Sequence, residues 1–345
     1  MVKKIAAICI TLIFCACVSS NTSVSGSRAP RVPEWVRDPY SKYDRQTNVA
    51  AVGSGSSREI AEKSALANLV AIFGQSIQVD EKVSVSYQEA VRSGVAAAWS
   101  ENTAIDTNII TTTGMDSLVG AEIGEVWDDG REYYAAAVLN KAKTAQIYSG
   151  MIASNRTIIN NLVDIPEAEK FTLDGFARYQ LAALVADVTT GYGNLLAVIG
   201  TPVERLKYGD DYRLEAINIT KAIPVGLRVQ NDVSGRVQGA FAKTLSNLGF
   251  QSGQNNSRYM LDVNIVTSVV EITNNPNKWT RIVVNANLMD VSLGTVLLPY
   301  NFNDRQGHTT QAEADNRAYA AAERKINEEY PKLLNDYLSQ LLPKK

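Results

Sequence analysis

All three cysteines of this 345-residue chain, Cys9, Cys15 and Cys17, lie within its first seventeen residues. The rest of the chain therefore has no disulfide, no thiol nucleophile and no cysteine ligand for a metal ion. Such a chain must be stabilised by its hydrophobic core. Its length and its 45% content of hydrophobic residues are sufficient for this, and the length predicts two domains or one large one.

An apolar run of signal-peptide length, residues 5–16, follows two lysines and is too short to span a bilayer. It ends in Phe14-Cys15-Ala16-Cys17, which resembles the bacterial lipobox, although Phe14 stands where leucine is usual. In that motif the cysteine after a small residue is lipidated on sulfur and becomes the new N-terminus. We therefore predict a signal peptide over residues 1–16 and lipidation, with palmitate-type acyl chains, at Cys17. The alternative is an ordinary secretory signal with incidental cysteines.

Two or more acyl chains anchor a protein stably to a membrane. Val18 and Ser19 follow the predicted anchor without an aspartate, which favours the bacterial outer membrane over the inner one. Residues 17–32 are rich in Ser, Asn and Gly and are predicted to form a flexible tether. No later segment approaches about twenty uninterrupted apolar residues, so nothing after Cys17 is expected to span a membrane.

The body is predicted to be of the α+β class, with two small units of antiparallel sheet packed with helices and joined by a helical hairpin or connector. The first unit covers residues 33–140. Its predicted elements are a strand at 48–54, a turn at Gly53-Ser54-Gly55, a helix opened by a Ser56–Glu59 capping box, and strands at 76–87, 104–113, 121–127 and 131–139. Asp128-Asp129-Gly130 between the last two predicts a hairpin.

The connector is predicted over residues 141–221. It has helices at 141–162 and 167–188, with a break at Pro166 and another at Gly191 and Gly193. The second unit, residues 222–345, is predicted to have a strand at 224–229, a helix capped by Asp232, strands at 259–271, 280–290 and 295–302, and a long helix opened by Thr310 and Glu313. The same order of elements occurs twice, which suggests a structural duplication.

Residues 33–73 contain a Pro-x-Trp start (PEWV), a strand ending in Val-Gly-x-Gly and an alanine-rich helix. This pattern resembles the LPP-twenty family of bacterial envelope lipoproteins, over roughly residues 33–150. The resemblance implies an envelope lipoprotein with no catalytic residues to transfer. The part from Ile223 onward is similar, in its order of elements, to small α+β domains of outer-membrane lipoproteins, which bind proteins.

Two features could carry chemistry but have a plainer explanation. Gly53-Ser54-Gly55 follows a strand and opens a helix, as a phosphate-binding loop does, but the third glycine is replaced by Arg58 and no Walker lysine follows. His308 is the only histidine, and nothing like Gly-x-Ser-x-Gly accompanies it. We therefore predict a structural turn at Gly53-Ser54-Gly55. For His308 we predict a position in a solvated loop or at a helix start.

The acidic pairs do not have the spacing of a calcium loop. Asp128-Asp129 is predicted to lie in a hairpin turn, Asp210-Asp211 in a loop and Glu328-Glu329 on a helix surface. Core packing is the expectation for the four tryptophans, Trp35, Trp99, Trp127 and Trp279. Trp279 alone, at a strand start after an Asn-rich turn, is a candidate for an exposed partner surface.

The formal charge of −2 becomes −4 when the signal is removed with Lys3 and Lys4, which argues against binding to nucleic acid. We predict no cofactor, no metal and no catalytic residue. The predicted function is a lipid-anchored, non-catalytic component of the bacterial envelope that binds another envelope protein at the outer membrane. A surface-exposed antigen or adhesin is the alternative, and an enzyme with a site assembled from scattered residues is a further one.

Overall fold

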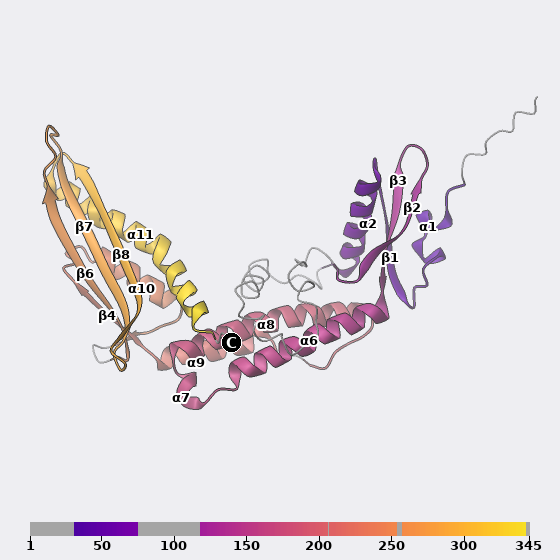
Figure 1. Cartoon of the computed structure of the whole chain (residues 1–345), viewed down its shortest axis with the longest axis horizontal. Helices are drawn as coiled ribbons and strands as arrows, with labels where there is room; N and C mark the ends of the chain where they lie inside the picture. Colours follow the sequence, from indigo (N-terminus) through magenta and orange to yellow (C-terminus); the bar gives the residue numbers. More distant parts are fainter. Residues whose placement is uncertain (1–30, 75–117, 206, 254–256, 343–345) are drawn as a thin grey trace, which may run out of the picture.

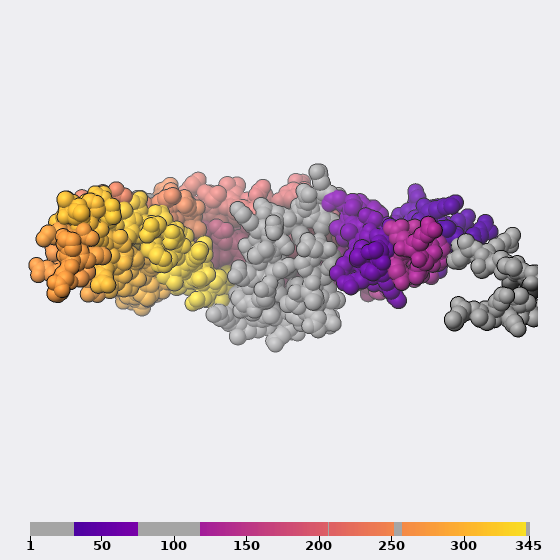
Figure 2. Space-filling view, turned by 90° about the horizontal axis from the view of Figure 1, so that it is seen from above, coloured from indigo at the N-terminus to yellow at the C-terminus, as the bar shows by residue number. Residues whose placement is uncertain are grey.

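The computed structural model describes residues 31–74, 118–205, 207–253 and 257–342 of the chain. Cys17, most of the predicted tether, the strands predicted at 76–87 and 104–113, and Trp99 lie outside these residues. In the described part the protein is elongated, with one sheet at each end and a bundle of helices between them (Figure 1, Figure 2). The predicted α+β class is confirmed.

The N-terminal unit is an antiparallel sheet covered by one helix. Its strands are β1 (Asn48–Gly55), β2 (Ala121–Asp128) and β3 (Tyr133–Asn140), in the order β1-β3-β2. Helix α2 (Arg58–Phe73) packs on β1 and β3, while α1 (Glu34–Arg37) and the short helix η1 (Pro39–Ser41) precede β1. Ala61 and Ala65 of α2 are completely buried, and these small side chains allow the helix to lie close to the sheet.

The predicted glycine turn is wrong, because Gly53 and Gly55 are part of strand β1. A Cβ atom on Gly53 would lie only 2.1 Å from the backbone nitrogen of Ala65. Glycine is therefore required here for the approach of α2 to the strand, and a turn is not the reason for it. The predicted capping box is also wrong by one residue: Ser57 is the N-cap and accepts a hydrogen bond from the backbone nitrogen of Ile60 at 3.3 Å.

The connector contains α6 (Lys141–Val163), α7 (Glu167–Lys170), α8 (Leu173–Val198) and α9 (Gly209–Ala222). The predicted break at Gly191 and Gly193 is wrong, because α8 continues through both glycines and buries them. Packing thus outweighs the helix propensity of glycine, which costs about 1 kcal/mol per residue. By length and composition α8 could cross a membrane, but 61% of its apolar window is buried inside the protein, as in a core helix.

The C-terminal unit is a five-stranded sheet in the order β5-β4-β6-β7-β8. These strands are β4 (Val225–Gln230), β5 (Ser252–Gly253), β6 (Tyr259–Val270), β7 (Lys278–Asp290) and β8 (Thr295–His308). Strand β4 pairs in parallel with β5 and β6, so this sheet is mixed and the prediction of a purely antiparallel one is corrected. The β6–β7 and β7–β8 pairs are antiparallel, as predicted.

Helices α10 (Arg236–Asn247) and α11 (Gln311–Gln340) pack on this sheet (Figure 1). Gly235, with a φ of 70°, is the N-cap of α10, and the predicted cap Asp232 accepts instead from the backbone nitrogen of Gln238 at 2.8 Å. Thr310 caps α11 by accepting from the backbone nitrogen of Glu313 at 3.4 Å, as predicted. The aromatic centre of this core is Tyr330, whose ring lies edge-on to Phe241 at 4.8 Å.

The two ends of the helical pair α6–α8 belong to different hydrophobic cores. Tyr148 of α6 and Leu196 of α8 are buried with the N-terminal sheet, whereas Leu162 of α6 and Phe176 of α8 are buried with the C-terminal sheet. The connector therefore supplies side chains to both cores and is not an independent linker.

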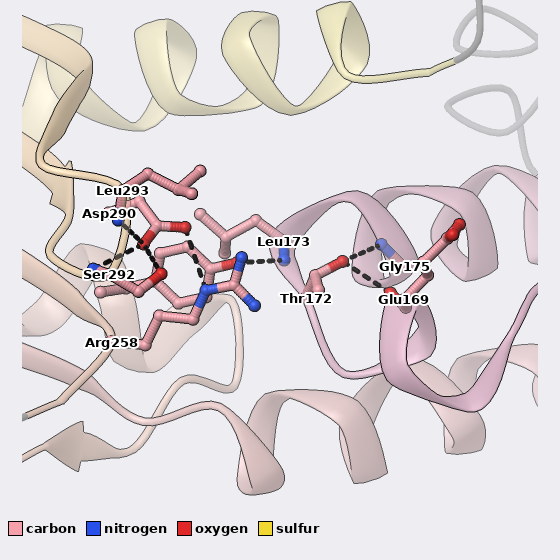
Figure 3. Close-up of polar contacts among 9 residues, drawn as sticks. Glu169, Thr172, Leu173, Gly175, Arg258, Asp290, Ser292 and Leu293 are labelled. Atoms are coloured by element: carbon pink, nitrogen blue, oxygen red, sulfur yellow. Dashed lines mark hydrogen bonds and ion pairs between the residues drawn. The ribbon is translucent and has the colours of Figure 1, made fainter.

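Polar contacts join the start of α8 to the C-terminal sheet (Figure 3). The backbone nitrogen of Leu173 donates to the hydroxyl of the buried Tyr259 at 3.3 Å. Beside it, Asp290 accepts from Arg258 Nε at 3.0 Å and from the backbone of the turn that follows β7. Burial raises the pKa of Asp290, but the hydrogen bonds from Ser292 and Arg258 outweigh it, and its pKa is below the usual value.

Candidate functional surface

One face of the C-terminal sheet is not covered by any helix of the described residues. Side chains alternate between the two faces of a strand, and α10 and α11 cover the face that carries Ile282, Val284 and Tyr300. We call the opposite side of β6, β7 and β8 the open face. Its residues on β7 and β8 include Trp279, Arg281, Val283, Asn285, Asn287, Met289, Pro299, Asn301, Asn303, Arg305 and Gly307; those on β6 include Asp262, Asn264, Val266, Ser268 and Val270.

Five asparagines gather on the open face. Asn264, Asn285 and Asn301 lie side by side on three neighbouring strands, and Asn287 and Asn303 flank this row. The Asn301 amide donates to the Asn285 side-chain oxygen. Asparagine is disfavoured in strands, so solubility alone does not account for five of them on one surface. Each amide offers both donors and an acceptor, which suits contacts with polar groups of a partner.

Three arginines add positive charge to this surface. Arg228 of β4 pairs with Asp262 through two hydrogen bonds of 3.1 and 3.2 Å. Arg281 donates to the Asn303 oxygen at 3.0 Å, and Arg305 lies directly opposite it in the register. Among the described residues, neither Arg281 nor Arg305 has a carboxylate within 4.0 Å. Two guanidinium groups thus remain available for carboxylates of a partner.

Trp279 lies at the end of the open face nearest the β6–β7 turn. It pairs with Gly307, where a Cβ atom would lie 2.8 Å from two ring atoms, so glycine allows the indole to rest on the neighbouring strand. The residue is half-buried, and among the described residues its Nε1 has no hydrogen-bond partner. Trp279 is therefore partly exposed on the open face, and its role as a partner surface stays a prediction.

The other sequence candidates lie elsewhere. His308 is on the helix-covered side at the end of β8, not in a turn, and its Nδ1 accepts from the backbone nitrogen of Thr310 at 3.5 Å. Arg58, in the glycine-rich segment, pairs with Glu62 at 2.7 Å. Trp35 is buried, and Trp127 packs against Tyr134 with ring centroids 5.4 Å apart.

The acidic pairs have local roles. Asp128 and Asp129 accept backbone hydrogen bonds in the β2–β3 turn, as a hairpin predicts. The predicted loop at Asp210 is wrong, because Asp210 and Asp211 begin helix α9. Glu329, on the surface of α11 as predicted, accepts from Lys325 at 3.1 Å. In the described ranges no three His, Cys, Asp or Glu side chains lie together as metal ligands would.

The asparagine row was missed at the level of sequence. Its signal is the spacing of two in Asn285-Ala-Asn287 and Asn301-Phe-Asn303, which places each pair on one face of its strand. That the two pairs meet follows only from the register of β7 and β8, which the sequence does not reveal.

No protein-family model and no curated protein matches the chain, so the resemblance to the LPP-twenty family stays a prediction. Solved structures are similar to it. One is a secreted protein of Helicobacter pylori, with 14% identity and a TM-score of 0.40, covering 81% of this chain and 97% of that one. Another is a minor lipoprotein of Acinetobacter baumannii, with 15% identity and a TM-score of 0.25, covering 36% of this chain and 96% of that one. The function proposed for this chain rests on its own residues.

Proposed function

We propose that this protein is a lipid-anchored, non-catalytic component of the bacterial cell envelope that binds another envelope protein through the open face. Cys17, after a signal-length apolar run, supports the anchor, and the absence of aspartate after it supports the outer membrane. The open face supports the binding role. It is the single observation that carries the proposal, because it gathers five asparagines with two arginines that have no carboxylate partner among the described residues.

The charge of the open face indicates the kind of partner. Arg228 is neutralised by Asp262, so Arg281 and Arg305 leave a surplus of positive charge on a face whose other side chains are neutral. The rest of the chain is slightly acidic. A partner with an acidic, polar surface is complementary to this face, since charge complementarity favours both encounter and specificity. Arginine and tryptophan are also enriched at protein interfaces.

In-cell photo-cross-linking tests the binding role. A photoreactive residue placed at Asn285 or Asn301 should give discrete adducts with one envelope protein, and the same residue at Glu328 on the surface of α11 should not. Arg281→Glu with Arg305→Glu should abolish the adducts by reversing the charge. Equal adducts from all positions, or none from the open face, would contradict the proposal.

The anchor is tested separately. Cys17→Ser should abolish incorporation of a radiolabelled fatty acid and release the protein from membranes, while Cys15→Ser serves as the control. Continued labelling of the Cys17 variant would refute the assignment. Turnover of a defined substrate that His308→Ala abolishes would support an enzyme instead.

A further inference from the structure

A cavity of about 330 Å³ opens between the end of α6, the middle of α8 and the start of α9. Its apolar wall is formed by Ile159 and Val163 of α6 and by the ring of Tyr212 of α9. Thr189 lies at its base, and its hydroxyl is already engaged, since it donates to the Val185 carbonyl at 2.6 Å. The cavity lies in the connector and is separate from the open face.

Three cations line this cavity: Arg156 from α6, and Arg205 and Lys207 from the segment between α8 and α9. Like charges gathered in one hollow repel each other, and the chain as a whole is slightly acidic. Among the described residues, no carboxylate lies within 4.0 Å of Arg205 or Lys207. Arg205 and Lys207, which are both exposed, thus have no carboxylate partner in the described part of the chain, and their position beside Arg156 favours an anionic ligand.

Two of the three cations make contacts at the rim of the cavity. Arg156 donates to the carbonyl oxygen of Glu204 at 3.5 Å, and its Nη1 is 3.9 Å from the Glu204 carboxylate, which is exposed. Lys207 Nζ lies 5.9 Å from the centre of the Tyr212 ring. The first contact links the segment before α9 to α6, and the second links it to α9. Opposite them, the exposed Asn160 adds an amide to the lining.

We infer that this cavity, which we call the cationic pocket, binds a phosphate-bearing ligand. Three cations less the charge of Glu204 leave two positive charges, which match a phosphate monoester dianion better than a single carboxylate. Guanidinium groups bind phosphate oxygens in bidentate fashion. The apolar wall of Ile159, Val163 and Tyr212 leaves room for an organic substituent on the phosphate. The phosphate can come from a phospholipid headgroup or from a soluble phosphate ester.

Calorimetric titration of the full chain in neutral detergent tests this inference with two probes, inorganic phosphate and dihexanoyl phosphatidic acid below its micelle concentration. Saturable binding of at least one probe is expected. Comparable binding of both indicates a soluble phosphate compound as the source, and binding of the lipid alone indicates a headgroup. Arg205→Gln with Lys207→Gln should weaken binding at least about tenfold, because both charge-assisted contacts are lost.

Lys243→Gln with Arg324→Gln is the matched control, since it makes the same change of charge at two exposed positions outside the cationic pocket. It should leave binding unchanged. Asn160→Asp, at an exposed position, should also weaken binding by placing a negative charge in the lining. This variant tests the inference if the double variant does not fold. Failure of both probes to bind at millimolar concentration, or wild-type binding by the pocket variants, would overturn the inference.

Discussion

Replacement of Gly53 by alanine should be among the most destabilising single substitutions in the N-terminal unit. The new Cβ would lie 2.1 Å from the Ala65 backbone nitrogen and 2.4 Å from the Ser64 carbonyl carbon. Ordinary contact begins at 3.4 Å, so α2 would have to move by about 1.3 Å, the difference between the two distances. No side chain can yield here, because the obstructing atoms are backbone.

The size of the loss in stability follows from the contacts that a displacement of α2 would disrupt. The helix buries Leu69 and Phe73 against the sheet, and Asn68 donates to the Val52 carbonyl at 2.9 Å. Overpacking costs about 1–3 kcal/mol or more, and loss of one hydrogen bond adds about 1 kcal/mol. We therefore expect a loss in the free energy of unfolding of at least about 2 kcal/mol, which lowers the Tm of a small unit by about 8–16 °C.

Scanning calorimetry of the full chain measures the loss of stability, and hydrogen exchange should show that the loss is confined to β1 and α2. Two substitutions serve as controls. Ser54→Ala, at an exposed position of the same strand, should be nearly neutral. Gly239→Ala, in the exposed interior of α10 with open space around its Cβ, should stabilise by about 0.5–1 kcal/mol. A Gly53→Ala protein within about 0.5 kcal/mol of the wild type would refute the reasoning about close packing.

Two further predictions concern buried polar groups. Folding lowers the pKa of Asp290, so its ionised form contributes to the free energy of unfolding. This contribution is complete above the pKa of the unfolded state, about 3.9, and is lost as the pH falls through the pKa of the folded state. Asp290→Asn should therefore cost about 1–3 kcal/mol at pH 7 and much less at pH 3, by urea unfolding; an equal cost at both pH values would contradict this. Tyr330 is buried, and among the described residues its hydroxyl has no hydrogen-bond partner. Tyr330→Phe should be neutral or stabilise by up to about 1 kcal/mol in the same assay, and a loss above about 2 kcal/mol would reveal an unrecognised partner.

Local patterns predicted most elements, and nonlocal packing decided the rest. The alternation in residues 280–290 indicates β7 because one face of the strand is buried. Nothing local reveals that β4 pairs in parallel with β6, since that contact joins residues more than thirty positions apart. Gly53 and the glycines at 191 and 193 were misinterpreted for the same reason: their purpose is close packing against distant backbone or burial in a core, not a turn.

The candidate sites show the same division. The spacing of Asn285 and Asn287 is visible in the sequence, but the surface exists only once β6 and β8 bring Asn264 and Asn301 beside them. The cationic pocket joins Arg156 to Arg205, almost fifty residues later, across two helices. Neither site has a contiguous motif, so sequence reasoning alone could reach only Trp279.

Because α6 and α8 contribute side chains to both cores, they fix the distance and the orientation of the open face relative to the N-terminal unit. The 26 residues of α8 correspond to about 39 Å at about 1.5 Å per residue. Removing one residue from a helix would rotate the residues beyond the deletion by about 100° about the axis of that helix. Adding seven residues, which are almost two full turns, to each helix would lengthen the helical pair by about 10 Å and leave the orientation of its ends almost unchanged. The distance and the orientation of the open face relative to the N-terminal unit can therefore be varied separately through the lengths of α6 and α8.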